Sequence, residues 1–439
     1  MKVLKFGGTT LGSAAMIKKV AALIQKGNNH IIVLSAFEGM TNALIEIANH
    51  LYKKNPDGAQ AIIDRLETHY SNLIAALYST QEYKRMAEGV LEKHFGSIRS
   101  FTKELFTGFE EKGILAQGEM ISTSLMHLLL KERQMNIALI PALDFMRTDK
   151  NSEPDPVYIK ERLHRQLERY PDADNYITQG YICRNAYGEI DNLERGGSDF
   201  TASLIGAAVQ AEEIQIWSDN DGMPNIDPHY VDHTFSIRHL QFEEAAELAY
   251  FGARILHPTC ILPARMNNIP VRMLNILNPD APGTLISSPM EKGKIKSVAA
   301  KDGITAIKII SGRMLLAYGF LRKVFEIFEY YQTPIDMVVT SEVAVSVTID
   351  QTKHLDNILA DLKKYGTVSI DTNMTIICVV GDLDWDNLGF ESKAVQALKD
   401  VKVRMISYGG SNYNISFLIR TEDKTRALQA LSTNLFTIL

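Results

Sequence analysis

The first ten residues constrain the fold more than any other stretch of the chain. Lys2 to Phe6 is apolar enough for a short buried strand, Gly7 and Gly8 end it in a turn, and Ser13 can cap a following helix. In a strand, glycine turn and helix, backbone N–H groups and the helix dipole point at one spot, which favours a phosphate. Lys5 can add a positive charge there; a structural turn with a solvated lysine is the alternative.

This stretch is neither of the two best-known phosphate loops. The chain has no G-x-x-x-x-G-K-[ST] sequence, and no G-x-G-x-x-G sequence followed about twenty residues later by an acidic residue. Any nucleotide site here therefore belongs to another class.

Composition narrows the class of protein and its partners. A chain of 439 residues is too long for one core, so two or three domains are expected. The net charge of −6 without a basic run argues against nucleic-acid or acidic-membrane partners. Cys183, Cys260 and Cys378 lack metal or redox spacing, and no signal peptide or membrane-spanning run is recognisable. We expect a cytoplasmic protein with no metal site built from its side chains.

Alternating strand and helix patterns over roughly the first 280 residues predict a three-layer αβα sandwich with a mainly parallel sheet. His30 to Ser35 is too apolar to be exposed on one face and fits a central strand. Ligands of such sheets bind beyond the carboxyl ends of the strands, so Ser35 and Thr41 are candidate site residues. Residues 57 to 112 are polar and helical in pattern, and predict a helical insertion.

Two further stretches carry charged site candidates. Arg195 to Asp199 reads R-G-G-S-D and opens a helix, so it predicts a second anion-binding turn in which Arg195 can hold a carboxylate with two hydrogen bonds. Asp199 can orient an ammonium or a magnesium-bound water. Glu119 is expected in the first turn of a helix beginning at Ala116, where the helix dipole alone would favour it.

The C-terminal third contains a duplicated module. Ile304 to Asp371 has a β-α-β-β-α-β pattern, and the same pattern restarts at Thr375 with an offset close to 70 residues. The second copy lacks its sixth strand. We expect Lys294 to Ala299, just before the first copy, to supply that strand.

Together these motifs resemble the aspartate kinases of the amino acid kinase family. The chain carries K-F-G-G-T-T from Lys5, the Ser35 to Asn42 loop, Gly118-Glu119, the R-G-G-S-D turn and F-G-A-R-I-L-H-P from Phe251. The repeat resembles paired ACT domains, which are ferredoxin-like α+β domains. The resemblance is closest to the monofunctional, lysine-sensitive type. It implies a catalytic domain at 1–286, a linker at 287–303, and ACT domains at 304–373 and 374–439.

The resemblance also implies an activity and its residues. ATP with Mg²⁺ would phosphorylate the β-carboxylate of L-aspartate to 4-phospho-L-aspartate, the first step toward lysine, threonine and methionine. The catalytic residues would be Lys5, Asp199 and Arg195. The substrate would be lined by Thr41, Glu119, Tyr181, Arg195 and Ser198. The nucleotide would meet Lys5, Gly7, Gly8, Ser35, Ser218, Asp219 and Arg254.

The same resemblance implies feedback inhibition by an amino acid, with lysine the leading effector. Its pocket would be formed by Phe320, Leu321, Asp336, Thr340, Ser341 and Glu342. A homodimer or homotetramer assembled through the ACT domains is expected.

Three positions depart from the family pattern: Glu194 before the arginine turn, and Pro224 and His229 in the loop that follows Asp219. Two alternatives stay open, and these three positions suggest the first of them. One is a catalytically weak or inactive amino-acid sensor on a kinase scaffold. The other is a kinase of another amino-acid carboxylate, such as glutamate.

Overall fold

The computed structural model describes residues 1–102, 106–193, 196–251, 258–312, 318–384 and 386–436. Its contacts divide the chain into two compact units. The first comprises Met1–Met223 and Leu256–Pro289, and the second comprises Pro224–Ile255 and Met290–Leu439. Among the described helices, none is both long and apolar enough to cross a bilayer.

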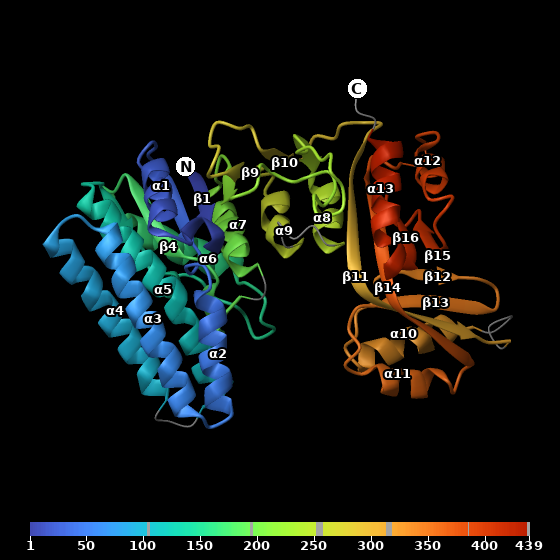
Figure 1. Ribbon diagram of the computed structural model, residues 1–439, viewed down its shortest axis with the longest axis horizontal. Coiled ribbons are helices and arrows are strands. Elements are labelled where there is room, and N and C mark those ends of the chain that lie inside the picture. Colours follow the sequence, from blue (N-terminus) through green and yellow to red (C-terminus); the bar gives the residue numbers. More distant parts are fainter. Residues whose placement is uncertain (103–105, 194–195, 252–257, 313–317, 385, 437–439) are drawn as a thin grey trace. The chain divides into compact units, whose positions relative to one another are not determined.

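The first unit is built on a mainly parallel sheet with strand order β3-β4-β2-β1-β7-β9-β10 (Figure 1). All neighbouring pairs are parallel except β9 and β10. The strands are β1 Lys2–Phe6, β2 His30–Leu34, β3 Ile137–Leu139, β4 Asn175–Gln179, β7 Ile214–Ser218, β9 Val271–Asn275 and β10 Thr284–Ser287. The three-layer sandwich predicted from the alternating pattern is confirmed.

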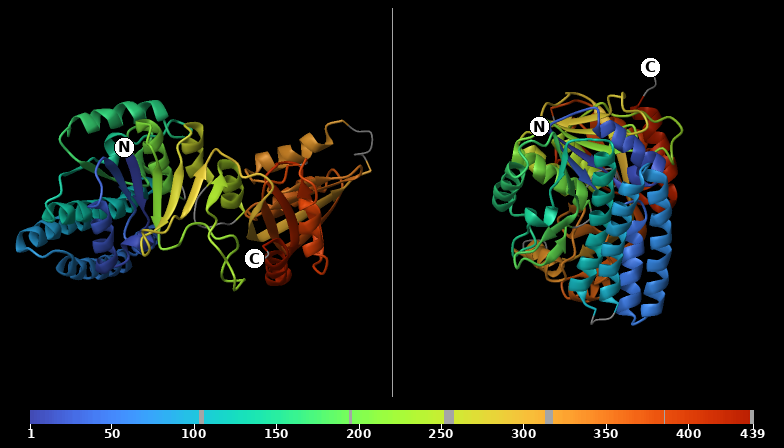
Figure 2. Two further views of the ribbon diagram at one scale, coloured as in Figure 1. Left: turned by 90° about the horizontal axis from the view of Figure 1, so that it is seen from above. Right: turned by 90° about the vertical axis from the view of Figure 1, so that its left-hand side faces the viewer.

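Helices cover both faces of this sheet (Figure 2). Leu4 and Phe6, on one face of β1, share a core with α1 Ala14–Ile24, α2 Met40–Tyr52 and α5 Gly108–Glu132. The other face carries α7 Gly197–Val209, which packs between α6 Pro156–Glu168 and α9 Pro258–Met266. A short antiparallel pair, β5 Ile182–Arg184 and β6 Ile190–Asn192, leads from β4 toward α7.

The predicted helical insertion is present as α3 Pro56–Leu77 and α4 Gln81–Phe101. These helices pack on α2 and α5. The expectation that a helix begins at Ala116 is wrong. Helix α5 begins at Gly108, where Thr107 caps it, so Glu119 lies in mid-helix and the dipole of a first turn does not account for it.

The second unit contains an antiparallel sheet with strand order β12-β13-β11-β14-β16-β15. The strands are β11 Ile295–Ile310, β12 Val338–Thr340, β13 Ala344–Ile349, β14 Thr367–Gly381, β15 Val403–Tyr408 and β16 Asn414–Arg420. The helices are α10 Phe320–Tyr330, α11 Leu355–Leu362, α12 Phe390–Ala397 and α13 Lys424–Leu435. Each copy of the repeat has its own core.

Two long strands are shared between the copies. The first part of β11, from Ile295 to Lys301, pairs with the part of β14 from Ile376 to Gly381, and the second part of β11 pairs with the beginning of β14. Residues ahead of the first copy therefore fill the strand position that the second copy lacks.

Residues 224–251 group with the second unit by their contacts. This segment includes β8 His239–Gln241 and α8 Phe242–Tyr250. Ile226 belongs to the core of the second copy, and Val298 N donates to Asn225 O at 2.8 Å. A segment inside the expected 1–286 domain is thus grouped with the second unit when the chain is divided by contacts.

Candidate active site

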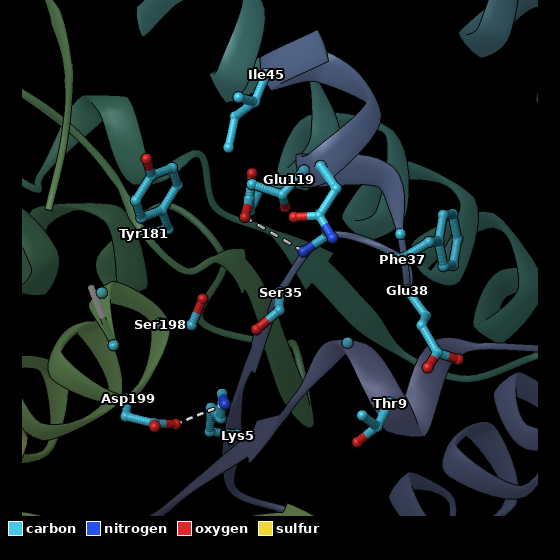
Figure 3. A pocket seen from close by; sticks show the side chains of 17 residues that line it. Lys5, Thr9, Ser35, Phe37, Glu38, Ile45, Glu119, Tyr181, Ser198 and Asp199 are labelled. Atoms are coloured by element: carbon cyan, nitrogen blue, oxygen red, sulfur yellow. Dashed lines mark hydrogen bonds and ion pairs between the residues drawn. The ribbon is translucent and has the colours of Figure 1, made fainter. Parts of the chain in front are cut away.

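A pocket of about 660 Å³ lies at the carboxyl ends of β1, β2 and β4 (Figure 3). The beginnings of α2 and α7 and the middle of α5 complete it. Its lining comprises Lys5, Gly8, Thr9, Ser35, Ala36, Phe37, Glu38, Gly39, Thr41, Asn42, Ile45, Glu119, Tyr181, Gly196, Gly197, Ser198 and Asp199. This is the edge of a parallel sheet at which ligands bind.

An ion pair occupies one end of this pocket (Figure 3). Lys5 Nζ, from β1, lies 2.5 Å from Asp199 Oδ1, from the first turn of α7. Both side chains are nearly buried, so their attraction is screened less than at a surface. The fold thus brings together two predicted site residues that are almost two hundred positions apart, and holds the ammonium group of Lys5 at the pocket wall.

A buried carboxylate occupies the other end. Glu119 is only 3 % exposed, and Ala36 N donates to its Oε1 at 3.3 Å. Its Oε2 has no hydrogen-bond partner among the described residues. Burial raises the pKa of Glu119 to about 8, against the smaller opposing effect of backbone N–H groups. The pocket therefore contains an incompletely satisfied carboxylate that a cationic group could complete.

Polar side chains lie between the two ends. Ser35 follows β2, Thr41 begins α2, and Ser198 lies in the first turn of α7. Tyr181 stands beside Glu119 in Figure 3. Burial, followed by the negative charge of Glu119, raises the pKa of Tyr181 to about 12. The pocket thus gathers all the predicted substrate residues that the structure describes.

The predicted glycine turn is present at the end of β1. Gly7 has φ −77°, and neither Gly7 nor Gly8 is among the residues with positive φ, so the left-handed freedom of glycine is not used. A side chain at Gly8 would instead collide with the loop that follows β2. A Cβ on Gly8 would lie 3.3 Å from Ala36 O. Close approach of the two backbones is the reason for glycine at this position.

Only some of the residues predicted to bind the nucleotide line the pocket. Ser218 ends β7, which pairs with β1, and Gly7 N donates to Trp217 O at 3.5 Å. Ser218 and Asp219 therefore lie near the glycine turn, although neither they nor Gly7 line the pocket. Arg195 and Arg254 lie outside the described residues.

The predicted effector residues lie in the second unit. The Phe320 side chain packs in the core of the first ACT copy, whereas Leu321 is exposed. Thr340, Ser341 and Glu342 are exposed at the end of β12. Asp336 is buried and engaged by two neighbours: Lys301 Nζ lies 2.6 Å from its Oδ1, and Tyr250 Oη donates to the same oxygen at 2.9 Å.

Sequence reasoning missed part of the lining. Ile45 and Asn42 were not singled out, although both follow Thr41 on α2, and Ile45 lies one helical turn later on the same face. Helical spacing would have identified Ile45. Among the described residues, no three His, Cys, Asp or Glu side chains gather as metal ligands.

Comparison with known proteins agrees with this geometry. Residues 1–275 match the amino acid kinase family, and residues 377–435 match an ACT domain. Aspartokinase 2 of Arabidopsis thaliana, a chloroplastic protein, is 34 % identical over 99 % of this chain and 84 % of its own length. The lysine-sensitive aspartokinase 3 of Escherichia coli is 30 % identical over 99 % of both chains.

A solved structure shows the same fold along the whole chain. The crystal structure of E. coli aspartokinase III in complex with aspartate and ADP superposes with a TM-score of 0.87 at 30 % identity, covering 99 % of this chain and 100 % of that one. The chain therefore belongs to the aspartokinases, the aspartate kinases of the amino acid kinase family.

Proposed function

We propose that the described pocket transfers the γ-phosphoryl group of ATP to the β-carboxylate of L-aspartate, with Lys5 at the phosphoryl end and Glu119 at the amino-acid end. One observation carries the proposal. The Lys5–Asp199 ion pair and the unsatisfied carboxylate of Glu119 line the same pocket. That arrangement offers a cation to a phosphoryl group and an anion to an ammonium within one substrate-sized space.

The chemistry suits these groups. A β-carboxylate oxygen of aspartate attacks the γ-phosphorus, the bond to the β–γ bridging oxygen breaks, and ADP leaves with that electron pair. The nucleophile is already ionised at neutral pH, so no general base is needed. Catalysis then consists of positioning and charge stabilisation. Lys5 neutralises charge on the transferred group, Asp199 holds Lys5 in place, and Gly8 and Ser35 offer hydrogen-bond donors.

The amino-acid end fixes the orientation of aspartate. Glu119 receives the α-ammonium, with Thr41, Tyr181 and Ser198 around it. Arg195 is assigned to the α-carboxylate by its place in the R-G-G-S-D turn. With its α-groups held at that end, aspartate directs its β-carboxylate toward Lys5.

The nucleotide is assigned to the turn after β1 and the neighbouring end of β7. Gly7, Ser218 and Asp219 lie there, and Arg254 is assigned by its motif. Mg²⁺ would arrive with the phosphates of ATP and keep several waters, as this ion prefers. No protein cage is required, because the oxygen ligands come from the nucleotide. When bound, the ion neutralises phosphate charge.

Regulation is assigned to the first ACT copy, with lysine as the effector. Phe320, Leu321, Thr340, Ser341 and Glu342 would form its pocket with Asp336, the buried carboxylate. The second copy differs at the matching place. In the second copy, Asp371 corresponds to Lys301 and Arg404 corresponds to Asp336. An ion pair is kept, with Arg404 Nε 2.9 Å from Asp371 Oδ2, but the acidic and the basic residue have exchanged places. At this matching place, the first copy thus offers a buried carboxylate to an ammonium effector and the second copy does not.

The proposal includes the domain boundaries, with catalysis in 1–286, a linker at 287–303, and ACT domains at 304–373 and 374–439. A homodimer or homotetramer through the ACT domains is part of it. Size-exclusion chromatography with light scattering tests the assembly, and a monomer with or without lysine would contradict it.

Hydroxylamine trapping tests the activity. ATP, Mg²⁺ and aspartate should give aspartate-dependent hydroxamate, glutamate should give little, and Lys5→Met should give none. Added lysine should lower the yield, whereas threonine serves as the comparison effector. Lysine binding without any hydroxamate would instead support an inactive sensor, and product from glutamate alone would support the other kinase.

A further inference from the structure

Tyr181 has an unusual backbone. It is a bulky aromatic residue, yet its φ is +66°, in the left-handed region that glycine and asparagine usually occupy. It stands between β4 and β5, directly at the pocket wall. A non-glycine residue held in this conformation persists only where its surroundings enforce it, and such residues cluster at functional sites.

Thr201 enforces this conformation from the neighbouring helix. Tyr181 N donates to Thr201 Oγ1 at 3.1 Å, and that hydroxyl donates in turn to Gly197 O at 2.8 Å. On the other side, Leu193 N donates to Tyr181 O at 2.7 Å. Both backbone polar groups of Tyr181 are therefore fixed, one of them by a threonine side chain that is completely buried in α7.

Two glycines bring the loop after β4 into contact with the start of α7. A Cβ on Gly180 would lie 2.6 Å from Ser198 Cβ, and a Cβ on Gly197 would lie 2.7 Å from Tyr181 Cδ2. Neither site could accept a side chain without displacing these neighbours. The loop that carries Tyr181 and the turn that carries Ser198 and Asp199 therefore form one packed assembly.

The ring of Tyr181 lines the pocket at its carboxylate end. It stands beside Glu119 in Figure 3, and the negative charge of Glu119 contributes to the raised pKa of Tyr181. We expect a ring in this place to reduce the water around a bound ammonium, and electrostatic attraction to Glu119 is stronger where water is reduced. The position of the ring depends on the left-handed backbone that Thr201 holds.

We infer that Thr201 is a positioning residue that sets the affinity for the amino-acid substrate through the backbone of Tyr181. This rests on the proposed function, because it takes Glu119 as the ammonium site. Thr201 lies behind the wall of the pocket and does not line it. A purely structural Thr201 would affect stability alone, and that is the rival to be tested.

Steady-state kinetics of Thr201→Val distinguishes the positioning role of Thr201 from a purely structural role. Thr201→Ser is the matched control. Valine keeps the shape but cannot accept the hydrogen bond from Tyr181 N. We expect the KM for aspartate to rise ~10-fold, with kcat and the KM for ATP within about twofold. Serine keeps the hydroxyl and should stay within about twofold of wild type. A lowered melting temperature with an unchanged KM for aspartate would overturn the inference.

Tyr181→Gly distinguishes failure of the inference from failure of the proposed site. Glycine accepts φ +66° without strain, which offsets part of the stability lost with the packing of the ring and with the greater freedom of the unfolded chain, so this variant should still fold. Loss of the ring should raise the KM for aspartate ~10-fold or more. An unchanged KM for aspartate in Tyr181→Gly would remove Tyr181 from the substrate site. That result would overturn both the proposed lining of the site by Tyr181 and the role of Thr201. A raised KM here, with Thr201→Val like wild type, would overturn only the role of Thr201.

Discussion

Two buried carboxylates, Glu119 in the kinase pocket and Asp336 in the first ACT copy, are satisfied to very different degrees. Glu119 receives one backbone N–H, from Ala36. Asp336 receives Lys301, which also contacts Asp350 at 2.9 Å, and the hydroxyl of Tyr250. Both partners contact its Oδ1, and its Oδ2 has no hydrogen-bond partner among the described residues. Among the described residues, no cationic side chain pairs with Glu119, whereas Lys301 pairs with Asp336.

The difference shows in their acid–base behaviour. Burial raises the pKa of Glu119 to about 8, with little to oppose it. Burial also raises the pKa of Asp336, but Lys301 and Tyr250 act against that rise. Burial lowers the pKa of Lys301, yet its two carboxylate partners outweigh burial and leave that pKa above its ordinary value. In the proposed function a cationic ligand completes Glu119, whereas an ammonium at Asp336 must compete with or add to Lys301.

The largest effect is expected from Glu119→Gln, because the amide cannot pair with the substrate ammonium. The kcat/KM for aspartate should fall ~100-fold or more, as for loss of one partner of a buried charge pair. The KM for ATP should change little. Glu46→Gln, an exposed carboxylate on α2, is the control. Equal loss for both substrates would show that Glu119 supports the fold and does not select the amino acid.

Lys301→Met should destabilise the second unit, because it leaves Asp336 buried without its cation. We expect a loss of about 3 kcal/mol in unfolding free energy, measured by denaturant titration. Lys364→Met removes an exposed pair with Asp361, which solvent screens, and should change the unfolding free energy far less. Similar losses of unfolding free energy in both variants would mean that the buried ion pair of Lys301 contributes no more to stability than the exposed pair of Lys364.

Glu342→Ala should relieve inhibition by lysine, since it removes an exposed carboxylate from the proposed effector pocket. The half-inhibitory lysine concentration should rise ~10-fold with the basal rate nearly unchanged. Glu326→Ala, on the nearby helix α10, should leave inhibition intact. Unchanged inhibition in the Glu342 variant would remove that residue from the effector pocket.

A smaller effect is expected in the pH dependence of stability. Between pH 4.5, the ordinary pKa of a glutamate side chain, and the raised pKa of about 8, the folded free protein holds a proton on Glu119 that the unfolded chain has lost. Its unfolding free energy should therefore fall as pH rises through this window. Thermal melts should show a weaker fall for Glu119→Gln. Parallel pH profiles for the two proteins would contradict the raised pKa.

Much of this arrangement was predictable because regular patterns encode it. Alternating strands and helices predicted the parallel sheet, and loops at strand ends predicted Lys5, Ser35 and Asp199 in one pocket. The helix start at Gly108 was missed because Thr107 and Glu110 cap it well ahead of the apolar run. The role of Thr201 could not be predicted, since it depends on backbone angles at Tyr181, twenty residues away.

Proton release on aspartate binding tests most directly whether Glu119 is the ammonium site. Isothermal titration calorimetry at pH 7, in buffers of different ionisation enthalpy, measures it. With a pKa of about 8, free Glu119 is mostly protonated at pH 7, so aspartate should release close to one proton from wild type and none from Glu119→Gln. Aspartate binding to wild type without proton release would contradict the assignment of Glu119 as the ammonium site. Equal aspartate affinity of wild type and Glu119→Gln would contradict it as well.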